Sequence, residues 1–471
     1  MSTRGAWAGL ALLVSACTTV GPDYRGPPPS AVVHAPEATG AFLGAAEPHY
    51  SAAPVPGEWW RLYEDPVLDG LVRQSLKSNV DLRVAEANLA RARALLVQAG
   101  ADKLPSSAVG ASVGVGREPP LAPSVTYGVD FGVSYQVDLF GRIRRGIEAA
   151  RAETEAFQAA LDLTRITVAA DTTRAYASVC SVGYELSVAR RVLALQEASL
   201  ERTRRLVEAG RGTALDLSRA RAQVEVLRAN VPPLVVQRRV ALLRLAVLSG
   251  RPPAAFPPDV EACETPPRLA SPIPVGDGAA LLRRRPDVRQ AERALAAATA
   301  RIGVATADLY PTVNLGLSAG SLGLMNAIGQ DSTLRWSLGP LLSWTFPNTR
   351  VARASIEQAG AVARGALAEF DGVVLNALLE TESNLTQYTQ DLERVAALTA
   401  ARDFSAEAAR EADALYRGGR ESFLGVLDAE RTRADAEASL ASARTQLVAD
   451  QIALFLSLGG GWEEPPPAEG R

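Results

Sequence analysis

The chain combines hydrophobic patterns of two different periods. Long alanine-rich stretches place apolar residues seven positions apart, as in Leu427, Ala434 and Ala441. This heptad spacing predicts helices that pack side by side as coiled coils. The two longest predicted helices, residues 143–208 and 350–416, would each be about 100 Å long at the helical rise per residue. Tight glycine-containing turns follow both, so we expect two antiparallel helical hairpins.

Four other stretches alternate apolar and polar residues with the period of a strand. In YGVDFGVSYQVDLFG, residues 127–141, the apolar face carries Tyr127, Phe131 and Tyr135. The opposite face carries polar residues, among them Asp130, Gln136 and Asp138. The four predicted strands are residues 107–116, 127–139, 312–320 and 334–346. Each has the length of a tilted transmembrane strand, and the apolar-outside, polar-inside alternation is typical of membrane barrels.

Four strands are too few to close a barrel, and open sheet edges are not tolerated in lipid. A membrane barrel would therefore need strands from several copies, and the sequence alone does not choose between two, three and four copies. The alternative is a soluble four-stranded sheet that packs its apolar face on helices. The helices' own apolar seams are used against one another, which disfavours that alternative.

The chain contains an internal duplication. DLRVAEANLARARA, residues 81–94, aligns with DVRQAERALAAATA, residues 287–300, and EAGRGTALDL, residues 208–217, aligns with RGGRESFLGV, residues 417–426. Each unit is predicted to contain a helix, a strand pair, a long helix, a glycine-containing turn and a return helix. The chain is predicted to begin with a signal peptide (1–16) and an N-terminal extended segment (17–66). The first repeat (67–250), a Pro-rich linker (251–280), the second repeat (281–460) and a C-terminal tail (461–471) follow.

Individual elements add detail to this plan. The first unit's opening helix is predicted near residues 68–102, and the second unit's near 286–308. The return helices are predicted near residues 214–249 and 423–457. Pro232 and Pro233 lie inside the first return helix, where proline must kink or restart it.

The N-terminus has the form of an exported lipoprotein precursor. MSTRGAWAGLALLVSAC has one arginine, a short apolar run and small residues before Cys17. The run is too short for a transmembrane helix and fits a signal peptide. VSAC resembles a bacterial lipobox, which implies cleavage before Cys17 and lipidation of that residue. The alternative is a plain signal peptide with an incidental cysteine.

Composition removes several function classes. The net charge of −3, without a run of Lys or Arg, argues against nucleic acid as a partner. The three cysteines show neither a disulfide framework nor a zinc pattern, so Cys180 is expected to be a packed helix residue and Cys263 a linker residue. We find no nucleophile–base set, no phosphate loop and no metal-ligand cluster. We therefore expect neither enzymatic activity nor a metal or other cofactor.

The resemblance to a known family rests on five motifs in order. They are CTTVGPDYRGPP (17–28), WWRLYEDPVLDGLV (59–72), SYQVDLFGRIR (134–144), VPPLVVQRRVALLRLAVLSGRPP (231–253) and RRRPDVRQAE (283–292). Together they resemble the TolC-like outer-membrane factor family, and most closely its OprM/NodT-type efflux lipoproteins. The resemblance implies a mainly α fold with a small transmembrane β part. It also implies a homotrimer, in which four strands per chain build one 12-stranded β-barrel and the hairpins build a periplasmic α-barrel.

The same resemblance implies the function. The protein would be a passive exit duct for small molecules, lipid-anchored in the outer membrane of a Gram-negative bacterium and extending into the periplasm. A periplasmic adaptor protein would connect it to an inner-membrane pump, most simply of the resistance-nodulation-division type. The alternative function is a periplasmic coiled-coil scaffold or adaptor lipoprotein without a membrane barrel.

The two hairpin turns supply the candidate site. In the family, acidic rings near this end act as a gate, and the matching residue here is Glu421, with Asp216 as the second candidate. Three-fold symmetry would turn either carboxylate into a ring that binds cations and narrows a pore. The turn residues expected to contact the adaptor are Arg211, Gly212, Thr213, Arg420 and Ser422. The alternative for each residue is ordinary helix-end capping and solvation.

Overall fold

The protein is described by a computed structural model that covers residues 19–26, 32–117, 123–269, 271–347 and 349–460. The chain forms two compact units. Unit 1 contains Met1–Ser30, Ala87–Ala159 and Arg289–Val373, and unit 2 contains Ala31–Glu86, Ala160–Val288 and Val374–Arg471. Among the described residues, no helix has both the length and the apolar composition needed to cross a membrane.

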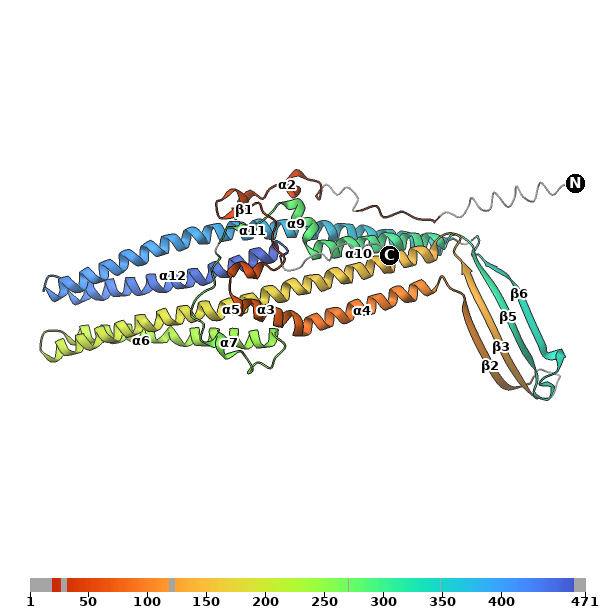
Figure 1. Cartoon of the computed structure of the whole chain (residues 1–471), viewed down its shortest axis with the longest axis horizontal. Helices are drawn as coiled ribbons and strands as arrows, with labels where there is room; N and C mark the ends of the chain where they lie inside the picture. Colours follow the sequence, from red (N-terminus) through yellow and green to blue (C-terminus); the bar gives the residue numbers. More distant parts are fainter. Residues whose placement is uncertain (1–18, 27–31, 118–122, 270, 348, 461–471) are drawn as a thin grey trace. The chain divides into compact units, whose positions relative to one another are not determined.

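Unit 1 contains a four-stranded antiparallel sheet (Figure 1). Its strand order is β2 (Ser106–Gly116), β3 (Ser124–Val137), β5 (Thr312–Leu324) and β6 (Leu334–Ser343). Short 3-10 turns, η3 (Met325–Ala327) and η4 (Asp331–Thr333), connect β5 to β6. The four predicted strands are thus present, and strands from the two sequence repeats pair side by side at β3 and β5.

The strand ends differ from the sequence prediction because a strand continues for as long as it has a partner. β5 was predicted to end at Gly320 but continues to Leu324, which pairs with Thr126. β6 was predicted to reach Phe346 but ends at Ser343, which pairs with the first residue of β5, Thr312. The length of the neighbouring strand depends on the tertiary structure, so it cannot be predicted from the alternation of apolar and polar residues in one segment.

Tyr127 corrects another prediction. It was expected on an exposed lipid-facing position, yet it is buried. Its side chain lies against the β5–β6 connection, where its hydroxyl is 2.7 Å from the Ser321 hydroxyl and donates to Thr333 Oγ1 at 3.1 Å. Phe131, which was predicted for the same face, is 43% exposed. The polar tip of tyrosine explains the difference, because a hydroxyl with two nearby partners favours burial there.

Long helices run through both units. They are α4 (Val80–Ala101), α5 (Arg142–Glu208), α10 (Pro286–Ala307) and α11 (Arg350–Arg417). In unit 1, Ala152, Ala296 and Ala297 form a small buried cluster between α5 and α10. Alanine side chains allow such helices to approach closely, which explains the alanine-rich composition of these segments.

Unit 2 contains the return helices α6 (Ala214–Ala229), α7 (Val231–Leu248) and α12 (Phe423–Ser457), which lie beside α5 and α11 (Figure 1). The prediction that Pro232 and Pro233 interrupt the first return helix is confirmed. α6 ends at Ala229, and both prolines lie in the first turn of α7, where a missing N–H leaves no intrahelical bond unmade. The second return helix, without such prolines, is continuous.

The predicted helix at residues 68–102 is two helices instead, α3 (Pro66–Ser78) and α4. Asn79 separates them. Its backbone N–H still donates to Ser75, while its side-chain oxygen accepts from the N–H groups of Asp81 and Leu82. Asn79 therefore ends one helix and caps the next, the role that asparagine favours over a mid-helix position.

The core of unit 2 gathers the segments that connect these helices. Trp59 in η2 (Trp59–Tyr63) is fully buried and stacks on Phe455 of α12 at a centroid distance of 4.7 Å. A two-stranded parallel sheet, β1 (Tyr50–Ser51) with β4 (Ile273–Pro274), joins the N-terminal segment to the inter-repeat segment. The short elements around it are α2 (Pro36–Thr39), η1 (Leu43–Ala46), α8 (Pro258–Glu261) and α9 (Gly278–Arg284).

A disulfide that the sequence analysis did not expect joins Cys180 of α5 to Cys263 of the inter-repeat segment. Cys180 is a buried helix residue and Cys263 lies between the repeats, as expected, but the expectation that they form no disulfide was wrong. Next to the bond, Arg238 of α7 donates to the Cys263 carbonyl oxygen at 2.9 Å. The inter-repeat segment is therefore fastened to both α5 and α7.

A pair of carboxyl groups joins α11 to α12. Asp391 and Asp450 are both buried, and their carboxyl groups influence each other's pKa. Burial and the neighbouring Asp391 raise the pKa of Asp450 to about 7, whereas the pKa of Asp391 lies below its usual range. Below about pH 7, Asp450 therefore keeps its proton beside an ionised Asp391, since charging both of two neighbouring buried carboxyl groups is unfavourable.

Removing the disulfide should destabilise unit 2. A bridge that closes a loop of this size contributes about 2–4 kcal/mol, largely by restricting the unfolded chain. We expect the double variant Cys180→Ala/Cys263→Ala to lose helical circular dichroism several degrees below the unaltered protein. Reducing agent should lower the melting temperature of the unaltered protein to the same value and leave the double variant unchanged. Equal melting temperatures for oxidised protein and variant would contradict this role.

The carboxyl pair should make stability depend on pH. The folded-state pKa of Asp450, about 7, lies above its ordinary value of 3.8. Its contribution is therefore complete below about pH 4 and is lost as the pH rises through about 7. We expect Asp450→Asn, which keeps the neutral form, to raise the melting temperature at pH 8 and leave it nearly unchanged at pH 4. Asp435→Asn, on the exposed side of the same helix, is the control and should show no such difference.

Candidate functional site

The two hairpin turns have the same backbone geometry. In the first, Gly210 adopts a left-handed φ of 72°, and Arg211 N–H donates to the Leu206 carbonyl at 2.8 Å. In the second, Gly419 has a φ of 69°, and Arg420 N–H donates to the Leu415 carbonyl at 2.9 Å. Such bonds close a helix C-terminus when glycine supplies the left-handed residue. Both repeats thus reverse the chain direction with the same turn conformation.

The return helices begin at equivalent caps. Thr213 caps α6 and accepts from the N–H of Asp216, and Ser422 caps α12 and accepts from the N–H of Gly425. The side chains of both caps are exposed. A short hydroxyl side chain at this position satisfies one of the free N–H groups of a helix start.

Both candidate gate carboxylates accept a hydrogen bond from the backbone N–H of an N-cap residue, but they occupy different positions in the two repeats. Asp216 Oδ2 accepts from the backbone N–H of Thr213 at 3.2 Å and completes a capping box. Glu421 Oε1 accepts from the backbone N–H of Ser422 at 2.7 Å. In the second repeat, Gly425 occupies the position of Asp216 and carries no side chain, so Glu421 supplies the carboxylate. Both negative charges lie at helix N-termini, where the helix dipole favours them.

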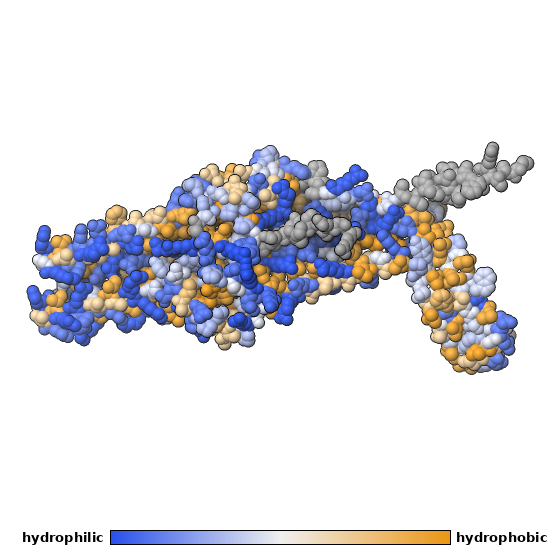
Figure 2. Space-filling view, in the orientation of Figure 1, coloured by the Kyte–Doolittle hydropathy of each residue, from blue (hydrophilic) through white to orange (hydrophobic). Residues whose placement is uncertain are grey.

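The arginines of the two turns are open to solvent. Arg211 and Arg420 are exposed, and Gly212 is half-buried. Figure 2 shows mainly hydrophilic residues at the ends of the two hairpins. Single side chains there can therefore reach another molecule without rearrangement of the backbone.

A charged cluster connects the two hairpins near the turns. Arg202 of α5 lies 3.6 Å from Asp413 of α11 and 4.0 Å from Glu430 of α12. Burial raises the pKa of Glu430 above its ordinary value, although hydrogen bonding to Ser199 and the charge of Arg202 act in the opposite direction. This cluster was missed from the sequence, because all three residues resemble solvated helix positions until the helices are placed side by side.

The N-terminal candidate, Cys17, lies outside the described residues, but the segment that follows it is firmly held in unit 1. Val20 N–H donates to the Phe140 carbonyl at 3.1 Å. The side chain of Arg145, only 4% exposed, donates to the carbonyls of Val20 and Gly21 and to Asp23. The Arg145 guanidinium also holds the pKa of Asp23 below its usual range. The chain a few residues after Cys17 is thus fixed beside the start of α5.

The sheet offers a second surface of functional interest. Hydrophobic residues cover much of it in Figure 2. On the apolar face, Val109, Trp336 and Leu338 are 76%, 79% and 72% exposed. Both edge strands, β2 and β6, have one neighbour each in the described chain. A large apolar face of this kind marks contact with a membrane or another protein.

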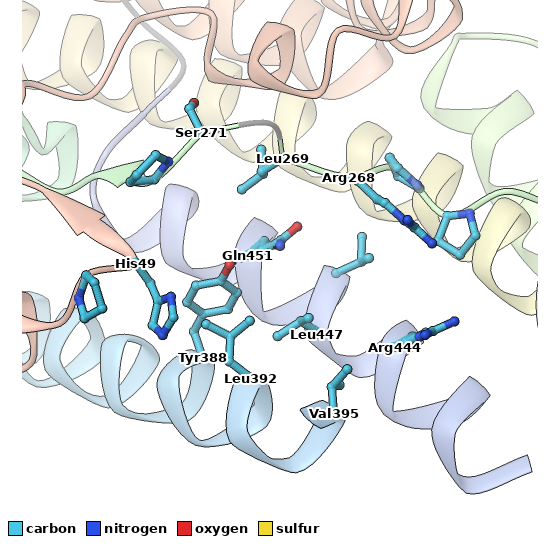
Figure 3. Close-up of a pocket in the computed structure, with 15 residues that line it drawn as sticks. His49, Arg268, Leu269, Ser271, Tyr388, Leu392, Val395, Arg444, Leu447 and Gln451 are labelled. Carbon is cyan, nitrogen blue, oxygen red and sulfur yellow. Dashed lines mark hydrogen bonds between the residues drawn. The ribbon is translucent and has the colours of Figure 1, made fainter. Parts of the chain in front are cut away.

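A cavity of about 460 Å³ lies in unit 2 between the inter-repeat segment, the segment at His49, and helices α11 and α12 (Figure 3). Apolar side chains such as Leu392 and Leu447 line it, with Arg268 and Arg444 on one side and His49 on the other. No carboxylate belongs to its described lining. Within the described residues there is also no group of three or more His, Cys, Asp or Glu side chains suited to a metal ion.

Comparison with known proteins agrees with this geometry. The family model described as outer membrane efflux protein matches residues 71–251 and 279–460. Nodulation protein T of Rhizobium leguminosarum bv. viciae is 31% identical over 471 residues, covering 100% of this chain and 96% of that protein. Toluene efflux pump outer membrane protein TtgC of Pseudomonas putida is 31% identical over 473 residues, covering 96% of this chain and 94% of that protein.

A solved structure extends the similarity to three dimensions. The outer-membrane channel OprN superposes on this chain with a TM-score of 0.87 at 37% identity, covering 94% of this chain and 99% of the other. The two matched segments of the family model include the sheet, the duplicated hairpins and their turns. The chain therefore has the TolC-like fold and belongs to the outer membrane efflux protein family.

Proposed function

We propose that three copies of this chain form the outer-membrane exit duct of a tripartite efflux system. The observation that carries the proposal is the sheet, which has an exposed apolar face, a polar opposite face and two edges without partners in the described chain. Three copies would supply 12 strands and close a barrel whose outer face is apolar. The heptad-patterned helices of the three copies would line a continuous periplasmic tunnel.

The duct itself does no chemical work in this proposal. Its cargo would be small molecules, and an inner-membrane pump of the resistance-nodulation-division type would supply the energy. A periplasmic adaptor would meet the hairpin turns, where Arg211 and Arg420 offer exposed guanidinium groups and Gly212, Thr213 and Ser422 offer backbone and hydroxyl groups. The relative named for toluene efflux supports a small-molecule cargo, although cargo choice would belong to the pump.

Lipidation of Cys17 would anchor each copy in the outer membrane. The fixed position of Val20 and Gly21 beside the start of α5 supports this role. Because β3 leads directly into α5, the lipid would enter the membrane close to the point where the barrel wall ends. The anchor and the barrel would then hold the protein at the same depth.

The gate would lie at the turns. Three copies of Glu421, and three of Asp216, would form rings of negative charge at the periplasmic entrance. Both carboxylates already bond to N-cap N–H groups, so their positions are fixed relative to the turns. A ring held this way attracts cations and repels anions at the narrowest part of a pore.

A pair of neighbouring residues on β3 tests the barrel. Val133 shares the apolar face and Ser134 the polar face. A carboxylate on the lipid face costs on the order of 2 kcal/mol per chain, whereas one in an aqueous lumen is tolerated. We expect Val133→Asp to abolish detergent-extractable trimers in membranes, and Ser134→Asp to leave them intact. An unaltered protein that washes off without detergent as a monomer would instead favour the periplasmic scaffold.

Removal of the gate charge should change single-channel behaviour. We expect Glu421→Ala to raise conductance in planar bilayers and to weaken cation selectivity, because one carboxylate ring is lost. Glu421→Gln should weaken selectivity while preserving the side-chain volume. Asp435→Ala, at an exposed acid elsewhere on α12, is the control. Unchanged conductance and selectivity in both Glu421 variants would remove this residue from the gate.

A further inference from the structure

The break in the first return helix lies beside a cavity of about 310 Å³. Its lining comes from α5, from the junction of α6 and α7 at Asn230 and Pro233, and from the middle of α12. All of these segments belong to unit 2. Small-molecule sites commonly have volumes of about 300–1,000 Å³. This cavity therefore has room for one compact ligand.

The walls of this cavity are mainly apolar. Val188 and Val192 of α5 and Leu227 of α6 are buried beside it. The side chains that α12 contributes are no larger than serine, and they are Ala434, Ala438, Ala441 and Ser442. Protein interiors are otherwise closely packed, so these short side chains leave a space open between α5 and α12. Ala438 and Ser442 are exposed, so a ligand can enter from solvent.

Glu185 of α5 is the ionisable side chain in this described lining. Its carboxylate accepts a hydrogen bond from the Thr445 hydroxyl but forms no ion pair within the part of the chain that the structure describes. Arg444, next to Thr445 on α12, donates to the Tyr184 hydroxyl at 3.1 Å instead. Burial raises the pKa of Glu185 above its ordinary value, while the bond from Thr445 acts in the opposite direction. A half-buried carboxylate thus lines an apolar space without a cation to balance its charge.

Asn230 provides a second polar group that the fold leaves unused. It is the N-cap residue of α7, yet its side chain makes no capping hydrogen bond. An N-cap side chain ordinarily accepts from the N–H of the second or third helical residue. Here those residues are Pro232 and Pro233, which have no N–H. The side-chain oxygen of Asn230 is therefore available to a ligand in the cavity.

We propose that this cavity binds a small lipophilic ammonium ion, with its apolar body against Val188 and Leu227 and its charged head on Glu185. An ammonium group offers several N–H donors, and a hydrogen bond from a cation to a carboxylate is stronger than one between neutral groups. Asn230 can accept a further bond from the same head. An anion would be repelled by Glu185, and a neutral ligand would leave its charge unbalanced. The site lies on the hairpin helices and goes beyond the proposed duct, on which it does not depend.

Ligands that share one apolar cage test the charge preference. They are 1-adamantylammonium, adamantan-1-ol and adamantane-1-carboxylate, which carry a positive, a neutral and a negative group. Each is titrated into the full-length protein in a neutral detergent, and binding is measured by isothermal titration calorimetry. We expect the ammonium to bind about tenfold more tightly than the alcohol, because it adds a hydrogen bond to a charged group, and the carboxylate not to bind. Partition of each ligand into micelles is the same for every variant and cancels when variants are compared.

Variants of the polar end separate the charge from the space. Glu185→Gln keeps the shape and a partner for Thr445, so it should reduce ammonium affinity about tenfold and leave alcohol binding unchanged. Asn230→Ala should weaken ammonium binding a few-fold without lowering the melting temperature, because no capping bond is lost. Asp435→Asn, at an exposed acid of α12 outside the lining, is the control for charge.

Substitutions at two neighbouring exposed positions of α12 test the space itself. Ala438→Phe should fill the cavity and abolish binding of both the ammonium and the alcohol. Ser439→Phe adds the same ring outside the lining and should leave binding unchanged. The proposal would be overturned if the unaltered protein did not bind the ammonium, if Glu185→Gln bound it equally well, or if binding survived Ala438→Phe. None of these results would affect the proposed duct, which is tested at the sheet.

Discussion

A sheet with two open edges is the constraint on which the rest of this structure depends. Every strand residue other than proline has a backbone donor and acceptor, and in lipid no water can satisfy them. β2 and β6 each leave one row of these groups free in the described chain. The apolar face requires lipid or protein contact, and the edges require a partner that continues the ladder. The simplest partner that satisfies both is another copy of the same chain.

The duplication explains why each chain brings two strand pairs and two hairpins. The two turns use the same glycine position and the same bond to the preceding helix, so the backbone solution predates the divergence of the repeats. The side chains diverged afterwards. Where the first repeat uses Asp216 in a capping box, the second has Gly425 and draws its carboxylate from Glu421. The requirement for a negative group at the helix start was kept, while its position along the chain changed.

Much of the fold could be predicted from the sequence, because it depends on periodicity. The period of two identified all four strands, and the heptads with their glycines identified the hairpins and the break at Pro232. The details that depend on contacts between distant segments could not be predicted. The end of β5, the burial of Tyr127 and the cluster around Arg202 each require a partner whose position the sequence does not contain.

The disulfide is a different case, because the sequence did contain a signal for it. An odd count of three cysteines argued against pairing. If Cys17 carries lipid, however, two cysteines remain in an exported chain, and an oxidising compartment favours their pairing. With Cys17 assigned to lipid, the two remaining cysteines, Cys180 and Cys263, are an even number that can pair. Asn79 is similar, since its preference for helix caps was visible but was outweighed by the continuous apolar pattern on both sides.

In the proposed gate, the carboxylates at the turns would contribute both to helix stability and to transport. A negative side chain at a helix N-terminus is favourable before any channel forms, because it satisfies a free N–H group and the helix dipole. Three-fold assembly would then bring copies of that charge together, and their mutual repulsion would weaken the contact between turns. The capping interaction fixes each carboxylate within its own chain, while the repulsion would act between chains. In a closed entrance built this way, the repulsion between the carboxylates would favour opening. An adaptor that binds the turns would therefore need to supply only part of the free energy of opening.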